Sequence, residues 1–161
     1  MRSRLIQTAF LSALLIVSKE LLSVLPNVEI VTLLIMAYTY VVGVRGSIYI
    51  AIIFTLIQAF IYPPHLWILT YFIIWPLLVI ISGLLKKVNA SNLSLAIAAA
   101  IFGLSFGAVD SLVNILIYGP QTFYAMWLRG LPWDIIHAIS NYLTVLILFK
   151  PIKNSLEKII N

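Results

Sequence analysis

The stretch KELLSVLPNVEIVTLL, residues 19–34, decides where the first two helices of this chain meet. Pro26 should end a first helix, because proline cannot continue one, and Asn27 should cap a second. Glu29 would then lie in the first turn of that second helix, where a negative charge complements the helix dipole. Together with Lys19 and Glu20, these residues form a polar group in a sequence that is otherwise strongly apolar. This group needs an explanation beyond helix termination.

The composition places the chain in a lipid bilayer. Of its 161 residues, 63% are hydrophobic and only 9% are charged, and the mean hydropathy is +1.11. A soluble domain carries roughly 25% charged residues. The net charge of +5 is typical of basic cytoplasmic loops and does not indicate a nucleic-acid partner. The absence of cysteine excludes disulfides, thiolate metal sites and cysteine nucleophiles.

Sequence breaks divide the chain into apolar segments close to the length that spans a membrane, about 20 residues. We expect an all-α integral membrane protein, one domain over residues 1–161, with six transmembrane helices in a compact bundle. The basic, apolar start resembles a signal peptide, but we expect it to remain as the first helix because further spans follow. Pro76 should kink the fourth span, and residues 120–131 should form a short amphipathic piece at the surface. The expected spans are about 5–25, 28–44, 47–62, 66–85, 93–118 and 132–150.

The distribution of basic residues predicts the orientation. Six spans put both termini on one side, and the positive-inside rule makes that side cytoplasmic. The chain is then expected in a bacterial cell membrane, with only Lys19 and Arg129 in its outer half. The other eight basic residues fall inside: Arg2, Arg4, Arg45, Lys86, Lys87, Lys150, Lys153 and Lys158.

Polar residues at helical spacing predict an outward-facing pocket. Asp134, His137 and Asn141 are spaced i, i+3, i+7 and share one face of the last span. Asp110 and Asn114 share a face of the fifth span. An ionised group near the bilayer centre costs about 2.5–3.5 kcal/mol on insertion scales, so such groups usually face a bundle interior or a wet cavity. Aromatic residues at similar depth could line it: Trp67, Tyr71, Trp75, Tyr118, Trp127 and Trp133.

Each of these features also has a simpler interpretation. The aromatic residues could form an interfacial belt. Asp134 could cap a helix, and His137 could bond a neighbouring helix. Lys19 and Glu20 could pair or extend to the outer interface. Asn27 and Glu29 could act as helix caps and nothing more.

Small residues form two seams. Ala9 and Ala13, in AFLSA, lie four apart on the cytoplasmic half of the first helix, where they could face a partner protein. Ala99, Gly103 and Gly107, also four apart, should serve internal packing. Neither G-x-x-x-x-G-K-[ST] nor H-E-x-x-H occurs. Two histidines are too few to predict a metal site. We therefore expect no catalytic residues, no metal and no cofactor.

The chain resembles, over its whole length, the substrate-binding S components of energy-coupling factor (ECF) transporters, which are ABC importers. The likeness lies in AFLSA (9–13), LPNVEIVTLL (25–34), FGLSFGAVDS (102–111) and GLPWDIIHAISNYLTVLILFKP (130–151). It implies high-affinity capture of a vitamin or related micronutrient from outside. It also implies delivery with a transmembrane coupling protein and two cytoplasmic ATPases, so the chain itself would not be an enzyme.

The resemblance assigns roles to residues of this sequence. It implies that the face carrying Ala9 and Ala13 docks on the coupling protein. It implies that the outer helix ends and loops bind substrate, and the start MRSR lacks the Met-His signature of nickel and cobalt importers. Cobalamin is favoured on the likeness of 26–29, followed by pyridoxine or a thiamin-precursor pyrimidine; a strictly anionic vitamin such as folate is disfavoured. From the residues and the resemblance together, the expected substrate-binding residues are Glu20, Asn27, Glu29, His65, Trp67, Tyr71, Asp110, Asn114, Trp133, Asp134, His137 and Asn141.

Two other functions compete with transport. A rod-shape scaffold of the MreD type has a similar size and span number, but it would not need polar groups converging on an outer cavity. An intramembrane enzyme could use Asp134 and His137 as acid and base, although no motif in the sequence names a reaction.

Overall fold

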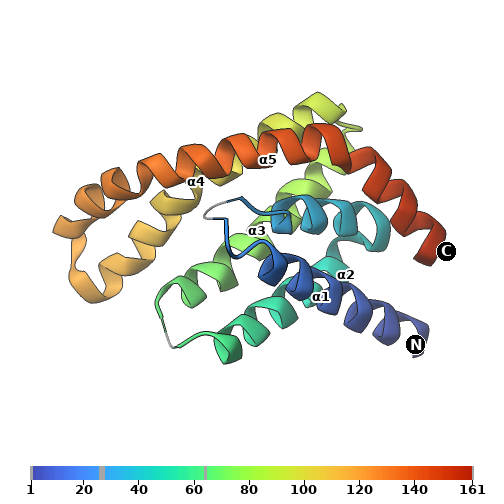
Figure 1. Cartoon of the computed structure of the whole chain (residues 1–161), viewed down its shortest axis with the longest axis horizontal. Helices are drawn as coiled ribbons and strands as arrows, with labels where there is room; N and C mark the ends of the chain where they lie inside the picture. Colours follow the sequence, from blue (N-terminus) through green and yellow to red (C-terminus); the bar gives the residue numbers. More distant parts are fainter. Residues whose placement is uncertain (1, 26–27, 64, 161) are drawn as a thin grey trace.

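The described part of the chain is a bundle of helices in the computed structural model (Figure 1). The structure describes residues 2–25, 28–63 and 65–160, with the backbone alone for residues 2 and 3. Pro26 and Asn27 lie outside the described residues, so the expected stop and cap there are not addressed. The helices are α1 (Arg2–Leu21), α2 (Val31–Ile61), α3 (Trp67–Lys87), α4 (Asn92–Tyr118), the 3-10 helix η1 (Pro120–Thr122) and α5 (Phe123–Ile160).

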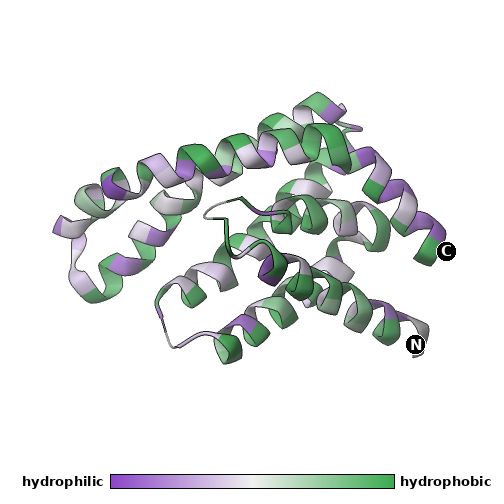
Figure 2. Ribbon diagram, in the orientation of Figure 1, coloured by the Kyte–Doolittle hydropathy of each residue, from purple (hydrophilic) through white to green (hydrophobic). Residues whose placement is uncertain are grey.

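Four of the helical stretches are long and apolar enough to cross a membrane: α2, α3, α4 and the combined stretch Pro120–Ile160. Figure 2 shows hydrophobic residues along most of these helices, with hydrophilic ones gathered toward the C-terminal end of α5. A membrane helical bundle is therefore the architecture that both the composition and the fold support.

The interruption expected at 43–47 occurs at Gly43, which divides α2 into two helices. Gly43 has φ +81° and ψ 169°, a conformation outside the helical region that residues with a Cβ rarely adopt. A side chain at this position would meet nothing within 4 Å. Backbone freedom, rather than space, is therefore the reason for glycine at the turn.

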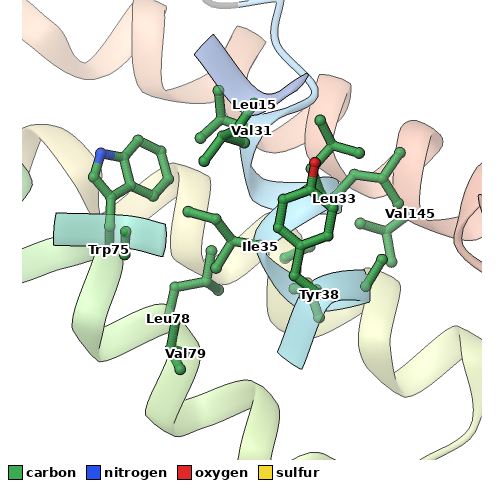
Figure 3. Packing of buried hydrophobic residues seen from close by; sticks show 14 of the residues in the cluster. Leu15, Val31, Leu33, Ile35, Tyr38, Trp75, Leu78, Val79 and Val145 are labelled. Carbon is green, nitrogen blue, oxygen red and sulfur yellow. The ribbon is translucent and has the colours of Figure 1, made fainter. Parts of the chain in front are cut away.

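The first half of α2 is the centre of the bundle. Every residue from Val31 to Thr39 is buried, so this half is surrounded by protein on all sides. Leu15 of α1, Trp75 of α3 and Val145 of α5 converge on it (Figure 3). A helix buried all round carries apolar residues on every face, which explains why VTLLIMAYT shows no polar side.

The last helix differs from the expectation. Residues 120–131 do not form a separate surface piece, because α5 begins at Phe123 and continues through Pro132 and Pro151 to Ile160. The chain instead turns at Gly119, whose φ is +82°, and η1 leads directly into α5. The helix therefore has no boundary at residue 132, because a proline within a long helix does not have to end it.

The second small-residue seam packs internally, as predicted. A Cβ added at Gly103 would lie 3.0 Å from the backbone of His137 and Ala138 in α5. A Cβ added at Gly107 would overlap the carboxylate of Asp134. The missing side chains therefore let α5 approach α4 closely, and Figure 1 shows the two helices side by side.

The two termini lie at one end of the bundle. The side chain of Gln7 donates a hydrogen bond to the carbonyl of Ile160 at 3.1 Å, and Figure 1 shows both termini on the same side. The C-terminal end of α3 also lies toward this end (Figure 1), and Lys86 in its last turn donates to the carbonyl of Tyr40 at 2.7 Å. The end of α2, the start of α3 and the turn 119–122 lie toward the opposite end (Figure 1).

Candidate functional site

A cavity of about 290 Å³ lies beneath the connection between α1 and α2. Residues 22–25 and 28–29 contribute one wall, and α2, α3 and α5 contribute others together with Phe106 of α4. Its described lining combines a few polar groups with aliphatic and aromatic surface, which is the usual make-up of a small-molecule site. The lining residues are Lys19, Leu22, Ser23, Leu25, Val28, Glu29, Val31, Tyr62, Tyr71, Trp75, Phe106, Asp134 and His137.

Glu29, which precedes α2, forms hydrogen bonds with residues of α2 and α5. Its carboxylate accepts hydrogen bonds from the Thr32 backbone N–H at 2.9 Å and from the Thr32 hydroxyl at 2.6 Å. His137 Nε2 lies 3.0 Å from Glu29 Oε1 and donates to it from α5. Glu29 therefore both caps α2 and borders the cavity, so the two interpretations of this residue hold together. Burial would raise the pKa of Glu29, but the hydrogen bonds from His137 and Thr32 outweigh it and hold that pKa below its usual value.

Asn141 extends this network below the cavity. Its amide donates to the Thr32 hydroxyl at 3.2 Å and to the Ala99 carbonyl at 3.4 Å. Asn141 is fully buried and does not line the cavity. It therefore fixes the positions of α2 and α4 relative to α5, and through Thr32 it supports Glu29.

A second network closes the rim where α1 meets the end of α2. Tyr62 donates to Glu20 Oε2 at 2.8 Å, and Gln58 donates to Glu20 Oε1 at 3.1 Å. Lys19 lies 3.1 Å from Glu20 Oε1 and donates to the Tyr62 hydroxyl at 2.6 Å. The pairing of Lys19 with Glu20 is confirmed, and the pair also anchors α1 to α2 beside the cavity.

Two residues of the cavity lining, Asp134 and Trp75, each carry a buried polar atom that has no hydrogen-bond partner among the described residues. Asp134 accepts from the Gly107 N–H at Oδ1, 3.0 Å away, whereas its Oδ2 is buried without a hydrogen bond. The indole Nε1 of Trp75 is also buried and unpartnered. Asp134 is 4% exposed and Trp75 is 2% exposed. Buried polar groups are almost always hydrogen-bonded, so these two atoms stand out as an acceptor and a donor.

Aromatic rings form the inner wall. Tyr71 and Trp75 meet edge to face with centroids 5.2 Å apart, and Tyr71 meets Phe106 at 6.0 Å. Phe106 in turn meets the His137 ring at 5.4 Å. Such a cluster offers both ring faces and ring edges to a flat ligand.

The interpretation of Asp134 as a helix cap is wrong. Asp134 lies in the interior of α5, which begins at Phe123, so no helix start is near it. His137 does bond across helices, but its partner is the cavity carboxylate of Glu29.

Several predicted site residues lie away from the cavity. His65 is exposed and accepts from the Trp67 N–H at the start of α3. Trp133 points outward with 50% of its surface exposed. Asp110 accepts from the Thr70 hydroxyl at 2.7 Å and from Asn114, which ties α4 to α3.

Of the remaining predictions, Trp67 contacts Tyr62 and Tyr71 with its ring and so backs the cavity wall without lining it. Asn27 lies outside the described residues. The structure thus brings together Glu29, Asp134 and His137, with Tyr71 beside them.

The sequence analysis did not single out Tyr62, Gln58, Thr32 or Phe106, whereas Trp75, expected among the lining aromatics, does line the cavity. Gln58 carried a usable signal, since an amide within a long apolar helix normally has a specific partner. Tyr62 follows it at i+4 on the same face. Thr32 and Phe106 carried no such signal, because their roles depend on which segments lie opposite them.

The first small-residue seam remains uncovered: Ala9 and Ala13 are both exposed on α1.

Among the residues that the structure describes, no group of three or more His, Asp or Glu could hold a metal ion. The chain matches no protein-family model, no curated protein and no solved structure.

Proposed function

We propose that this protein is the substrate-binding subunit of an ECF-type importer, which captures a small micronutrient in the cavity lined by Glu29, Asp134 and His137. The observation that carries the proposal is the convergence of Glu29, Asp134 and His137 on one cavity. Ionisable groups within a membrane bundle are costly and normally mark a substrate or ion path.

The position of the small-residue face supports the same function. Ala9 and Ala13 are exposed on α1, about two and three turns beyond the first residue of that helix. Small side chains let a second helix approach closely. A transmembrane coupling protein would dock on this face, and two cytoplasmic ATPases would supply the energy.

The proposed topology has six crossings, with both termini on the cytoplasmic side of a bacterial cell membrane. The basic residues support this, since the C-terminal end of α3, whose last turn contains Lys86 and Lys87, lies toward the end of the bundle that carries both termini (Figure 1). The first half of α2, from Val31 to Val42, is about 18 Å long at 1.5 Å per residue. That is shorter than the hydrocarbon core of about 30 Å. Because this half is enclosed by protein, its ends do not have to reach the lipid interface.

The cavity volume favours a small substrate. A volume of about 290 Å³ is close to the lower limit of ligand pockets, roughly 300 Å³. It equals the liquid volume of about ten water molecules, at about 30 Å³ each. A one-ring vitamin such as pyridoxine, or a thiamin-precursor pyrimidine, suits this space, whereas a corrinoid macrocycle is much larger. We therefore propose the one-ring compounds ahead of cobalamin.

The test is mass spectrometry of small molecules released when the purified full-length protein is denatured. A stoichiometric compound should be released from the wild-type protein and lost from His137→Ala. His65→Ala is the matched control, because it removes the other histidine of the chain, which is exposed and away from the cavity. A protein that carries no compound and binds none of a panel of vitamins would refute the proposal and favour the scaffold alternative.

A further inference from the structure

The cavity carries an excess of negative charge. Lys19 is the only Lys or Arg among the described lining residues, and its charge is matched by Glu20 at 3.1 Å. Glu29 and Asp134 add two carboxylates. Even if His137 is protonated and matches Glu29, Asp134 forms no ion pair with any of the described residues.

Asp134 is built to receive a donor. One carboxylate oxygen is fixed by the Gly107 N–H at 3.0 Å, and the other is buried without a partner. Leaving a buried charged oxygen unpaired is costly in a bundle that excludes water. A ligand that brings an N–H group, and with it a positive charge, would remove that cost when it binds.

The aromatic wall of the cavity calls for a hydrogen-bond acceptor on the ligand. Trp75 Nε1 is a buried donor without a partner in the described chain, so the ligand should also carry an acceptor. The rings of Tyr71, Trp75 and Phe106 lie together on this wall. Ring faces attract cations as well as other flat rings.

We infer that the ligand is a small cationic aromatic compound that donates an N–H hydrogen bond to Asp134 Oδ2 and accepts one from Trp75 Nε1. A protonated or amino-substituted nitrogen heterocycle has this chemistry. The inference rests on the proposed function, because it assigns a substrate class to the same cavity. Asp134 is the counter-ion, and the pair of Lys19 and Glu20 closes the rim without adding net charge.

Three probes of nearly equal size and shape test the charge preference: benzamidine, which is cationic at neutral pH, benzamide, which is neutral, and benzoate, which is anionic. Each is titrated into the purified full-length protein, freed of any bound compound, and followed by calorimetry. Benzamidine should bind about tenfold more tightly than benzamide, the gain typical of a charge-assisted hydrogen bond. Benzoate should show no binding.

Two variants test whether Asp134 is the cause of the preference for benzamidine over benzamide. Asp134→Asn removes the charge with little change in shape, so the benzamidine-to-benzamide ratio should fall to about one. Asp110→Asn is the matched control: it makes the same change in α4, and Asp110 bonds Thr70 outside the cavity. This variant should keep the tenfold ratio.

The outcomes separate this inference from the proposed function. If benzamide or benzoate binds as tightly as benzamidine, or if Asp134→Asn keeps the preference, the cationic class is refuted and the binding function stands. If no probe binds, the compound released from the native protein decides. If that compound is a cationic heterocycle and the Asp134→Asn protein does not retain it, the inference is supported. If it is neutral or anionic, the inference of a cationic ligand is refuted but the proposed binding function stands. If no compound is released, both the inference and the proposed function are refuted.

Discussion

Gly107→Ala should separate ligand binding from folding. The added Cβ would overlap Asp134 Oδ2 and would lie 2.9 Å from Asp134 Cγ, where ordinary contacts begin at 3.4 Å. The three atoms nearest to it all belong to the Asp134 side chain, so the carboxylate can rotate away while α5 stays in place. The rotation breaks the 3.0 Å hydrogen bond from the Gly107 N–H.

The two consequences differ in size. Losing a hydrogen bond to a charged group costs about 1.5–3 kcal/mol, and replacing glycine by alanine within a helix returns about 1 kcal/mol. The net loss of folding free energy should therefore be about 0.5–2 kcal/mol. A ligand that depends on Asp134 should lose about 1.5–3 kcal/mol, which is about 10- to 100-fold in Kd.

Gly103→Ala is the matched control. Its Cβ would lie 2.9 Å from Asn141 Nδ2 and 3.0 Å from backbone atoms of His137 and Ala138. The Asn141 amide and α5 therefore have to shift by a few tenths of an ångström, but the Asp134 carboxylate is not among the atoms that the new Cβ meets. Overpacking of this kind costs about 1–3 kcal/mol, again offset by about 1 kcal/mol of helix propensity.

The assay combines thermal unfolding in detergent with benzamidine titration. Both variants should unfold at a somewhat lower temperature than the wild-type protein. At a similar loss of stability, Gly107→Ala should bind benzamidine more weakly than Gly103→Ala does. Equal affinities in the two variants would refute the role given to Asp134.

Three further predictions follow from other parts of the molecule. Ala13→Trp should abolish uptake by the assembled transporter and leave benzamidine binding within about twofold; normal uptake would remove the docking assignment. Lys19→Met should tighten benzamidine binding about threefold, because it removes the only lining ammonium; weaker binding would contradict the charge account. Because the pKa of Glu29 lies below its usual value of 4.5, its carboxylate stabilises the fold fully at neutral pH, and this contribution is lost only as the pH falls below that value. Glu29→Gln should therefore have a lower melting temperature than the wild-type protein at pH 7. Its melting temperature should also fall less than that of the wild-type protein when the pH is lowered below 4.5.

Hydropathy and turn chemistry were enough to predict most of the helices. The break at Gly43 was expected from the glycine-rich GVRGS segment. The small-residue spacing of Gly103 and Gly107 correctly indicated close helix packing. The last helix was mispredicted, since Pro132 looks like a boundary in a sequence but lies within α5. A proline in a packed helix is tolerated when neighbouring segments hold the helix together, and neighbours are not visible in one sequence.

The site was predicted only in part for a similar reason. Helical spacing placed Asp134, His137 and Asn141 on one face, and all three are buried. Spacing could not show that Asn141 lies below the cavity or that Trp133 points to the outside. Adjacent positions on a helix differ by about 100° in direction, so a neighbour of a site residue usually faces elsewhere.

The sequence by itself determined that the chain is helical, apolar enough for a membrane, and polar at a few fixed helical positions. These properties depend on composition and local periodicity, which residues carry with them wherever they lie. Only the tertiary structure decided which polar atoms meet. It brought Glu29 within 3.0 Å of His137, which lies 108 residues away along the chain. It also left one oxygen of Asp134 without a partner in a cavity. Hydrogen bonds and their absence depend on distances of a few tenths of an ångström, and these distances are set by helix packing.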